Sequence, residues 1–205
     1  MSALISARGV RSTVVERDLR EPGAAGALFE QAERDLGPVS ILVNNASSWS
    51  QDSFSCRSTD GLGRSMQQVS NESFEANFSI DARAAALLIS EFARRHVHSG
   101  GSWGRIVGLS SGGESGFESE VSYGAAKAAL GNYTMSAGLE LARYGVTANI
   151  VYPPITDTGS VTEEVRRFAL EQGGHVAEPS EVAEVVGWLC GDSAQLVTGN
   201  RIRLR

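Results

Sequence analysis

Hydrophobic and polar positions follow two different periods along the chain, and these divide it into strands and helices. Short runs of apolar and β-branched residues are typical of buried strands, and they lie at 10–19, 40–43, 105–109, 146–151 and 196–204. Apolar residues spaced three or four apart indicate helices, which we expect at 22–36, 72–96, 121–144, 162–172 and 179–190. The stretch 47–70 is polar and rich in Ser and Gly, and it predicts a long surface loop.

The alternation of strands with helices predicts the fold class. A helical crossover between successive strands makes the strands parallel and places helices on both faces of the sheet. The sequence therefore predicts an α/β, Rossmann-like doubly wound sheet. Since the 205 residues contain neither an internal repeat nor a linker, we expect a single domain over 1–205.

Composition and charge narrow the class of protein. The hydrophobic content of 41% and the charged content of 20% are those of a globular chain rather than a disordered one. The net charge of −6 and the lack of a basic stretch argue against nucleic acid as a partner. No apolar run is long enough to span a membrane, and no signal peptide is evident. With Cys56 and Cys190 widely spaced, we expect a cytoplasmic protein.

The histidines do not predict a metal site. His96 and His98 are two residues apart, so they do not share a helix face, and no cluster of cysteines or carboxylates accompanies them. We expect both to be solvated at the end of a helix, and we expect no bound metal.

The basic residues are almost all arginine. Of 18 basic residues, Lys127 is the single lysine, and it follows Tyr123 by four positions on a predicted helix. That spacing places both side chains on one face, one turn apart. Because a nearby ammonium stabilises the phenolate, it is expected to lower the tyrosine pKa and to make Tyr123 a general acid/base.

Polar residues also stand at the ends of two predicted strands. Ser110 and Ser111 follow the strand at 105–109, and Asn44-Asn45-Ala46 ends the strand at 40–43. Ligands of open parallel sheets bind just beyond the carboxyl ends of the strands. A hydroxyl there can hydrogen-bond a substrate carbonyl while Tyr123 protonates it.

Taken in order, these motifs resemble the short-chain dehydrogenase/reductase family over nearly the whole chain. The resemblance implies that Tyr123 is the catalytic acid/base, that Ser111 binds the substrate carbonyl, and that Lys127 holds the nicotinamide ribose. The spacing from Ser111 to Tyr123 is one residue shorter than in the family, so Ser110 remains an alternative.

A fourth catalytic position departs from the family pattern. With the register taken from Phe74 and Phe78, Asp81 falls where the family has an asparagine, and Asn77 lies four residues too early. The resemblance therefore makes Asp81 the fourth catalytic candidate, and an aspartate there either is tolerated or weakens activity.

The resemblance also implies a cofactor and partners. NAD or NADP would react with a small carbonyl or alcohol substrate, and the chain would form a homodimer or homotetramer through its helices. Ser47 replaces the glycine that follows Asn-Asn-Ala in the family. The residues implied to bind the cofactor are Asp18, Leu19, Asn44, Asn45, Ala46, Tyr123, Lys127, Pro153, Thr156 and Thr158.

The 205 residues lack one family element. No Gly-x-x-x-Gly-x-Gly turn occurs in them, and the sequence starts in what resembles the second family helix, so roughly 50 residues have no counterpart. That turn normally cradles the cofactor pyrophosphate, so we expect the chain as given to bind NAD(P) weakly. A non-catalytic fragment or oligomerisation module, or a start codon assigned too late, are the alternatives.

The missing segment also affects the sheet. In the family, two further strands lie between those predicted at 10–15 and 40–43. Here these two strands must pair directly, or the first must detach.

Overall fold

The main sheet of the computed structural model has four parallel strands in the order β1-β4-β5-β6. The structure describes residues 5–111, 116–159, 161–171 and 173–205. In the register of the sheet, Ile41 pairs with Arg105 and Gly104 with Val146. This parallel arrangement confirms the predicted α/β class. The strands are β1 (Ile41–Asn44), β4 (Gly104–Leu109), β5 (Val146–Tyr152) and β6 (Arg201–Arg203).

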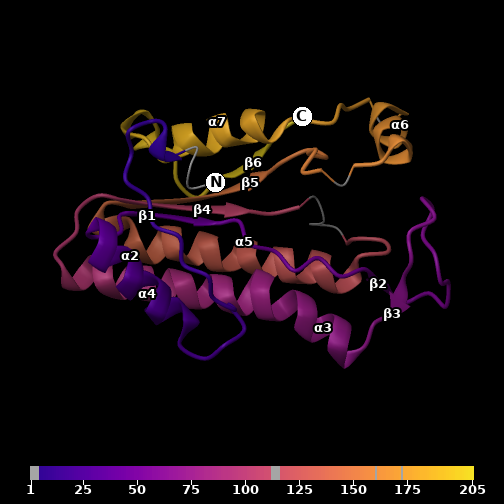
Figure 1. Ribbon diagram of the computed structural model, residues 1–205, viewed down its shortest axis with the longest axis horizontal. Helices are drawn as coiled ribbons and strands as arrows, with labels where there is room; N and C mark the ends of the chain where they lie inside the picture. The colour runs from indigo at the N-terminus through magenta and orange to yellow at the C-terminus, as the bar shows by residue number, and fades with distance from the viewer. Residues whose placement is uncertain (1–4, 112–115, 160, 172) are drawn as a thin grey trace.

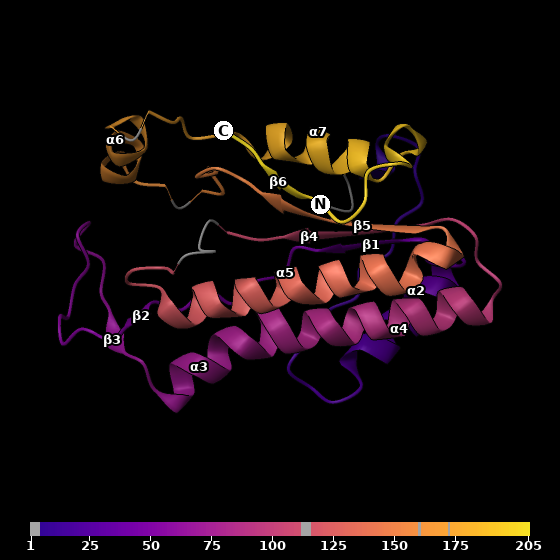
Figure 2. The ribbon, with the colours of Figure 1, turned by 180° about the vertical axis from the view of Figure 1, so that it is seen from behind.

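Helices cover the sheet on both faces (Figures 1 and 2). One layer contains α2 (Ala24–Leu36), α4 (Ala85–His98) and α5 (Val121–Leu141), and α7 (Pro179–Leu189) packs on the other face. The longest predicted helix, at 72–96, is continuous in direction but has three parts: α3 (Asn71–Asn77), the π-helical η1 (Phe78–Ala84) and α4. The remaining helices are α6 (Glu163–Glu171), η2 (Ala142–Tyr144) and η3 (Asp192–Ala194).

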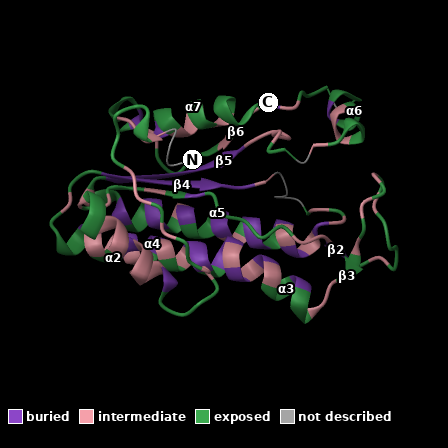
Figure 3. Ribbon diagram, in the orientation of Figure 1, coloured by how far each residue is buried: buried purple, intermediate pink, exposed green. Residues whose placement is uncertain are grey.

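The central strands β4 and β5 are buried along their whole length (Figure 3). Successive side chains of a strand point to opposite faces. Accordingly, Ile106 packs with the core of α2, α4 and α5, while its neighbour Val107 packs with Val151 and Leu189 under α7. A strand covered on both faces needs mostly apolar residues at consecutive positions, which is why these two strands are evident in the sequence as short runs of mainly apolar and β-branched residues.

The segment 47–70 lies beyond the carboxyl ends of the strands, at the same end of the molecule as α6 (Figure 1). It was predicted to be a loop, and it contains in addition a short parallel pair, β2 (Asp52–Ser53) with β3 (Gln67–Gln68). The buried carboxylate of Asp52 secures β2, because it accepts hydrogen bonds from Ser73 Oγ at 2.7 Å and from the Ser122 N–H at 2.8 Å. The loop is thereby attached to the helices α3 and α5.

The strand predicted at 10–19 does not form. Residues 10–18 have no regular secondary structure, and Val10 and Val14 are exposed. Within the described residues β1 pairs with β4 on one side and with no strand on the other, so this segment does not extend the sheet. It lies instead against the end of α2, where Thr13 Oγ1 donates to Asp35 at 2.6 Å. Of the two arrangements open to the sequence, the detached one is found.

The expectation that His96 is solvated is also wrong. Its side chain is buried, stacks on Phe92, and places Nε2 3.0 Å from the Tyr144 carbonyl oxygen. His96 lies four residues after Phe92, on the face that α4 turns to the core, so it is one of the packed core residues. The described residues contain no group of ligands suited to a metal ion.

The last strand is shorter than predicted. It spans 201–203 rather than 196–204, because 196–200 form a turn that crosses from α7 to the sheet. In the part of the chain that the structure describes, no helix is both long and apolar enough to cross a membrane.

Candidate active site

Tyr123 and Lys127 lie one turn apart on α5, as the spacing predicted. The Lys127 side chain is buried, and its ammonium donates to the carbonyl oxygen of Leu109, at the end of β4, over 3.0 Å. It also lies 5.5 Å from the centre of the Tyr123 ring. Lys127 therefore connects the helix to the carboxyl end of a central strand, where ligands bind in this class of fold.

Asp81 faces Lys127 from the π-helical turn η1. Its Oδ1 lies 2.8 Å from Lys127 Nζ, and neither side chain is more than 5% exposed. The other oxygen, Oδ2, accepts a hydrogen bond from the Ser48 N–H at 3.0 Å. π-helical turns occur frequently at functional sites, and this one directs the Asp81 carboxylate at the ammonium of Lys127.

Asn77, one turn earlier, has a different role. Its side chain accepts from the Ser50 N–H at 2.9 Å and donates to the Ser50 carbonyl oxygen at 2.9 Å. These contacts fasten the loop after β1 to α3. The residue that faces Lys127 is thus Asp81, which the register of Phe74 and Phe78 had placed at the fourth family position.

The electrostatics of Tyr123 differ from the expectation. Burial, and next the negative charge of Asp81, raise the pKa of Tyr123 to about 12, whereas hydrogen bonds with Ser111 and Ser47 act in the opposite direction. The predicted lowering of this pKa by Lys127 is therefore wrong for the chain as it stands. The main physical reason is burial of the phenol, which disfavours the charged phenolate, and the negative charge of Asp81 adds to it. The Lys127 ammonium does not offset these effects, because it is paired with Asp81 at 2.8 Å.

The structure distinguishes the two serines at the end of β4. Ser110 is buried, and its hydroxyl donates to the Lys127 carbonyl oxygen at 3.3 Å. Ser111 lines a cavity together with Tyr123, and its side chain acts to lower the Tyr123 pKa. The geometry therefore favours Ser111 over Ser110 as the residue that would meet a substrate.

The cavity beside Tyr123 has a volume of about 530 Å³. Ser111, Tyr123, Thr156 and Thr158 all contribute to its wall. The remaining predicted cofactor residues lie outside it, and Asp18 forms an ion pair with Arg20 at 2.7 Å. The structure thus brings together the residues predicted after β4, on α5 and after β5.

Sequence reasoning missed several residues of this site. Trp49 and Arg64, both from the loop after β1, line the cavity, as does Glu120 at the start of α5. Arg64 pairs with Glu120 at 3.1 Å and lies 5.7 Å from the Trp49 ring. Ser47, whose side chain acts to lower the Tyr123 pKa, had a usable signal, since it directly follows the strand-end motif Asn-Asn-Ala. The others had none, because a long stretch of loop separates Arg64 from the end of β1.

The chain is similar to many known proteins. Residues 2–204 match the family model described as enoyl-(acyl carrier protein) reductase. An uncharacterized oxidoreductase of Bacillus subtilis, YjdA, is 32% identical over 95% of this chain and 74% of its own length. An NADPH-dependent aldehyde reductase-like chloroplastic protein of Arabidopsis thaliana is 32% identical over 97% of this chain and 72% of its own.

The fold comparison agrees with the sequence comparison. The angucycline C-6 ketoreductase LanV, solved with bound NADP, superposes with a TM-score of 0.82 at 28% identity, covering 98% of this chain and 77% of LanV. A family model that matches almost every residue, relatives named as oxidoreductases and a shared fold all point the same way. The chain belongs to the short-chain dehydrogenase/reductase family of oxidoreductases.

Proposed function

We propose that the chain interconverts carbonyl compounds and alcohols with NAD or NADP as the second substrate, through Tyr123, Ser111 and Lys127. One observation carries the assignment: Tyr123 and Ser111 lie together in the wall of a cavity of about 530 Å³, and Tyr123 is one helix turn from a buried lysine. Similarity to LanV, which was solved with NADP, and to the NADPH-dependent Arabidopsis protein supports the choice of cofactor.

The residues present fit the nicotinamide-ribose part of that cofactor. Asn44, at the carboxyl end of β1, has a buried Nδ2 donor with no hydrogen-bond partner among the described residues. Lys127 carries three donors, of which one goes to Leu109 and one faces Asp81, so one is left for a ribose hydroxyl. Thr156 and Thr158 would meet the nicotinamide from the cavity wall. The reduced nicotinamide, when bound, supplies a hydride for the carbonyl carbon.

The side chains of the site provide the proton chemistry. In reduction, Ser111 donates a hydrogen bond to the substrate carbonyl oxygen, and Tyr123 transfers its hydroxyl proton to the same oxygen. In oxidation, the Tyr123 phenolate takes the proton of the alcohol. Lys127 lies one turn below the tyrosine, where its charge influences the proton affinity of the phenol.

Substitution of Tyr123 by Phe tests this function. We expect turnover of a panel of aldehydes and ketones with NADPH and NADH to fall by about 10²–10⁴-fold, because the proton donor is lost. Unfolding of the variant should resemble that of the wild type, since a single hydroxyl in a cavity wall is removed.

Tyr133→Phe is the matched control, because Tyr133 lies on the same helix with an exposed side chain and outside the cavity. Its turnover should be unchanged. Turnover of Tyr123→Phe at the wild-type rate would refute the assignment. Weak binding of NAD(P) by these 205 residues stays a separate prediction, which calorimetric titration with both cofactors tests.

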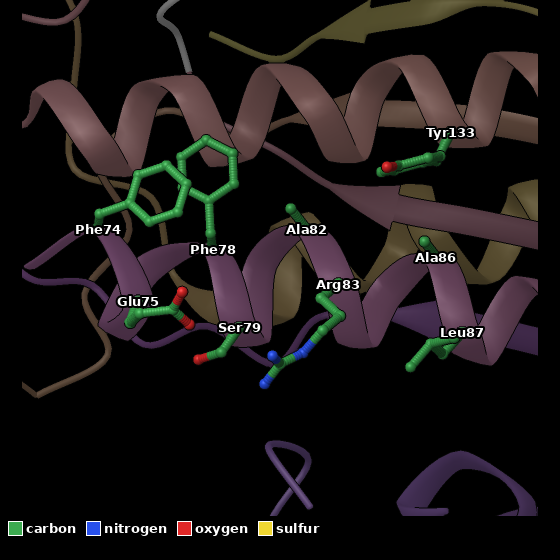
Figure 4. A pocket seen from close by; sticks show the side chains of 9 residues that line it. All are labelled: Phe74, Glu75, Phe78, Ser79, Ala82, Arg83, Ala86, Leu87 and Tyr133. Carbon is green, nitrogen blue, oxygen red and sulfur yellow. The ribbon is translucent and has the colours of Figure 1, made fainter. Parts of the chain in front are cut away.

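The helical face opposite the sheet supports a further proposal, a homodimer. A groove of about 400 Å³ lies between α5 and the continuous helix α3–η1–α4 (Figure 4). Phe74 and Phe78 stack at its end with ring centres 4.2 Å apart, and Leu87 and Tyr133 expose 51% and 46% of their surface along it. Exposed apolar groups gathered in this way mark an interaction surface.

A second copy of the chain is the occupant that we propose for this groove. Glu75 and Arg83 are both exposed and line it two turns apart (Figure 4). In a two-fold contact the same surface meets itself in the opposite direction, so Glu75 of each copy would face Arg83 of the other.

A cytoplasmic location is proposed as well, because Cys56 and Cys190 are both free and free cysteines are typical of a reducing compartment.

A further inference from the structure

We propose that Asp81, by pairing with Lys127, keeps the Tyr123 hydroxyl protonated, so that the site is in its carbonyl-reducing form at neutral and moderately alkaline pH and oxidises alcohols only at higher pH. Asp81 is in this view a positioning residue that acts through Lys127. The directional part of the inference rests on the proposed function, whereas the protonation of Tyr123 can be measured without any turnover.

The geometry supports an ion pair rather than a chance contact. Asp81 Oδ1 is buried and no hydrogen-bond donor of the described residues is aligned on it, so the ammonium at 2.8 Å is what compensates its charge. The carboxylate cannot rotate freely, since Oδ2 is held by the Ser48 N–H. Lys127 is fixed from the other side by the Leu109 carbonyl oxygen at 3.0 Å. Both partners are therefore locked in place.

The ion pair reduces the stabilisation that the Lys127 ammonium can give to the Tyr123 phenolate. A free ammonium 5.5 Å from the Tyr123 ring would stabilise the phenolate. A buried carboxylate beside that ammonium cancels most of this effect and adds repulsion toward the phenolate. The pKa of Tyr123 is accordingly raised to about 12, with burial as the largest cause and Asp81 as the next.

Other charged groups near Tyr123 do not replace this effect. Glu120 also raises the Tyr123 pKa, but it is paired with Arg64 at 3.1 Å. Asp52 is occupied by hydrogen bonds from Ser73 and Ser122, and Glu164 of α6 is exposed to solvent on the far side of the cavity. The charged groups around the tyrosine are therefore Asp81 from η1, Lys127 on α5, Glu120 with Arg64, and Glu164 of α6 in the cavity wall, whereas Asp52 is bonded to the start of α5.

The protonation state selects the direction that the site can carry at a given pH. Carbonyl reduction needs the phenol as a proton donor, and alcohol oxidation needs the phenolate as an acceptor. Raising the proton affinity of Tyr123 leaves the overall equilibrium of the reaction unchanged. It moves the pH at which oxidation reaches its full rate upward.

Alkaline titration of the phenolate absorbance tests the inference on the chain without cofactor. The signal of Tyr123 is the difference between wild type and Tyr123→Phe. We expect its midpoint well above the ordinary tyrosine value of about 10. In Asp81→Asn we expect the midpoint to fall by about one unit or more, and in Asp81→Glu, which keeps a carboxylate, to stay high.

Asp52→Asn is the matched control, because it removes another buried carboxylate next to α5 that does not touch Lys127. It should leave the Tyr123 midpoint nearly unchanged. An equal shift in Asp52→Asn, or no shift in a folded Asp81→Asn, would overturn the inference. If Asp81→Asn does not fold, the wild-type midpoint decides: a value at or below about 10 overturns the proposal.

Kinetics then test the directional part. In Asp81→Asn the pH profile of alcohol oxidation should move to lower pH by the same interval as the phenolate midpoint. An unchanged profile with a shifted phenolate midpoint overturns the link between Asp81 and reaction direction. Absence of activity in every variant and in the wild type would count against the proposed function, while the titration would still decide the protonation of Tyr123.

Discussion

At the residue scale, the site depends on the one basic residue that is not an arginine. Lys127 fits a narrow buried position between the Leu109 carbonyl oxygen and the Asp81 carboxylate. A compact ammonium can satisfy both at once, whereas a guanidinium is planar and larger and presents its donors in a fixed fork. The chain uses arginine at its 17 other basic positions, where the side chains are not enclosed in this way or, like Arg105, stack on an aromatic ring.

We therefore predict that Lys127→Arg is strongly damaging. The extra volume must be accommodated in a packed interior, which lowers the free energy of unfolding by about 1–3 kcal/mol, and turnover should be largely lost. Urea unfolding and steady-state rates measure the two effects. Arg167→Lys, the reverse exchange at an exposed position, should change neither, and a Lys127→Arg variant with wild-type rates would contradict the role given to the ammonium.

At the element scale, the turn between η2 and β5 brings the end of α5 back into the sheet. Gly145 occupies this turn with φ +71°, and its carbonyl oxygen accepts the Gly104 N–H at 3.1 Å, which starts the β4–β5 ladder. A Cβ at this position would lie 1.9 Å from the Ser102 carbonyl oxygen. The backbone itself is in the way, so no side-chain movement can relieve the clash.

We predict that Gly145→Ala lowers the free energy of unfolding by more than about 4 kcal/mol or prevents folding. Gly100→Ala provides a control with the same backbone conformation, because Gly100 also has φ +71° but an added Cβ there would meet nothing within 4 Å among the described residues. In that variant the free energy of unfolding should fall by only about 1–2 kcal/mol, the cost of placing a residue with a Cβ in the left-handed conformation. Chemical denaturation of both variants separates the effect of the steric contact from that of backbone strain. Equal losses of unfolding free energy in Gly145→Ala and Gly100→Ala would contradict the steric explanation.

At the scale of the whole molecule, the sheet and its helices leave an apolar groove open between α5 and α3–η1–α4. The same helices carry Asp81, Tyr123 and Lys127 on their inner faces. A dimer formed through the outer faces would therefore buttress the elements that hold the site. This connects the proposed assembly to the proposed chemistry.

Charge exchange tests the two-fold contact. Glu75→Arg and Arg83→Glu should each shift the chain from dimer to monomer in sedimentation velocity, because like charges would then meet across the axis. The double variant restores opposite charges and should restore the dimer. Monomeric wild-type protein, or single variants that stay dimeric, would rule out this arrangement.

The sequence by itself determined those features that depend on neighbouring residues. The strands β4 and β5 are evident as mainly apolar and β-branched runs because both of their faces are covered. The pair Tyr123 and Lys127 is evident because a helix brings residues four apart to one face. The position of Asp81 followed from the helical register of Phe74 and Phe78 for the same reason.

Tertiary structure decided what depends on the path of the chain. The strand predicted at 10–19 did not form because that segment lies against the end of α2 rather than beside β1, and His96 became a core residue because of the face that α4 buries. The direction of the Tyr123 pKa reversed because folding buries the phenol, and because η1 and α5, which are separate segments of the sequence, place Asp81 against Lys127 in the interior. Charges interact through space, in surroundings whose burial sets their strength, so their effect is decided when distant segments meet.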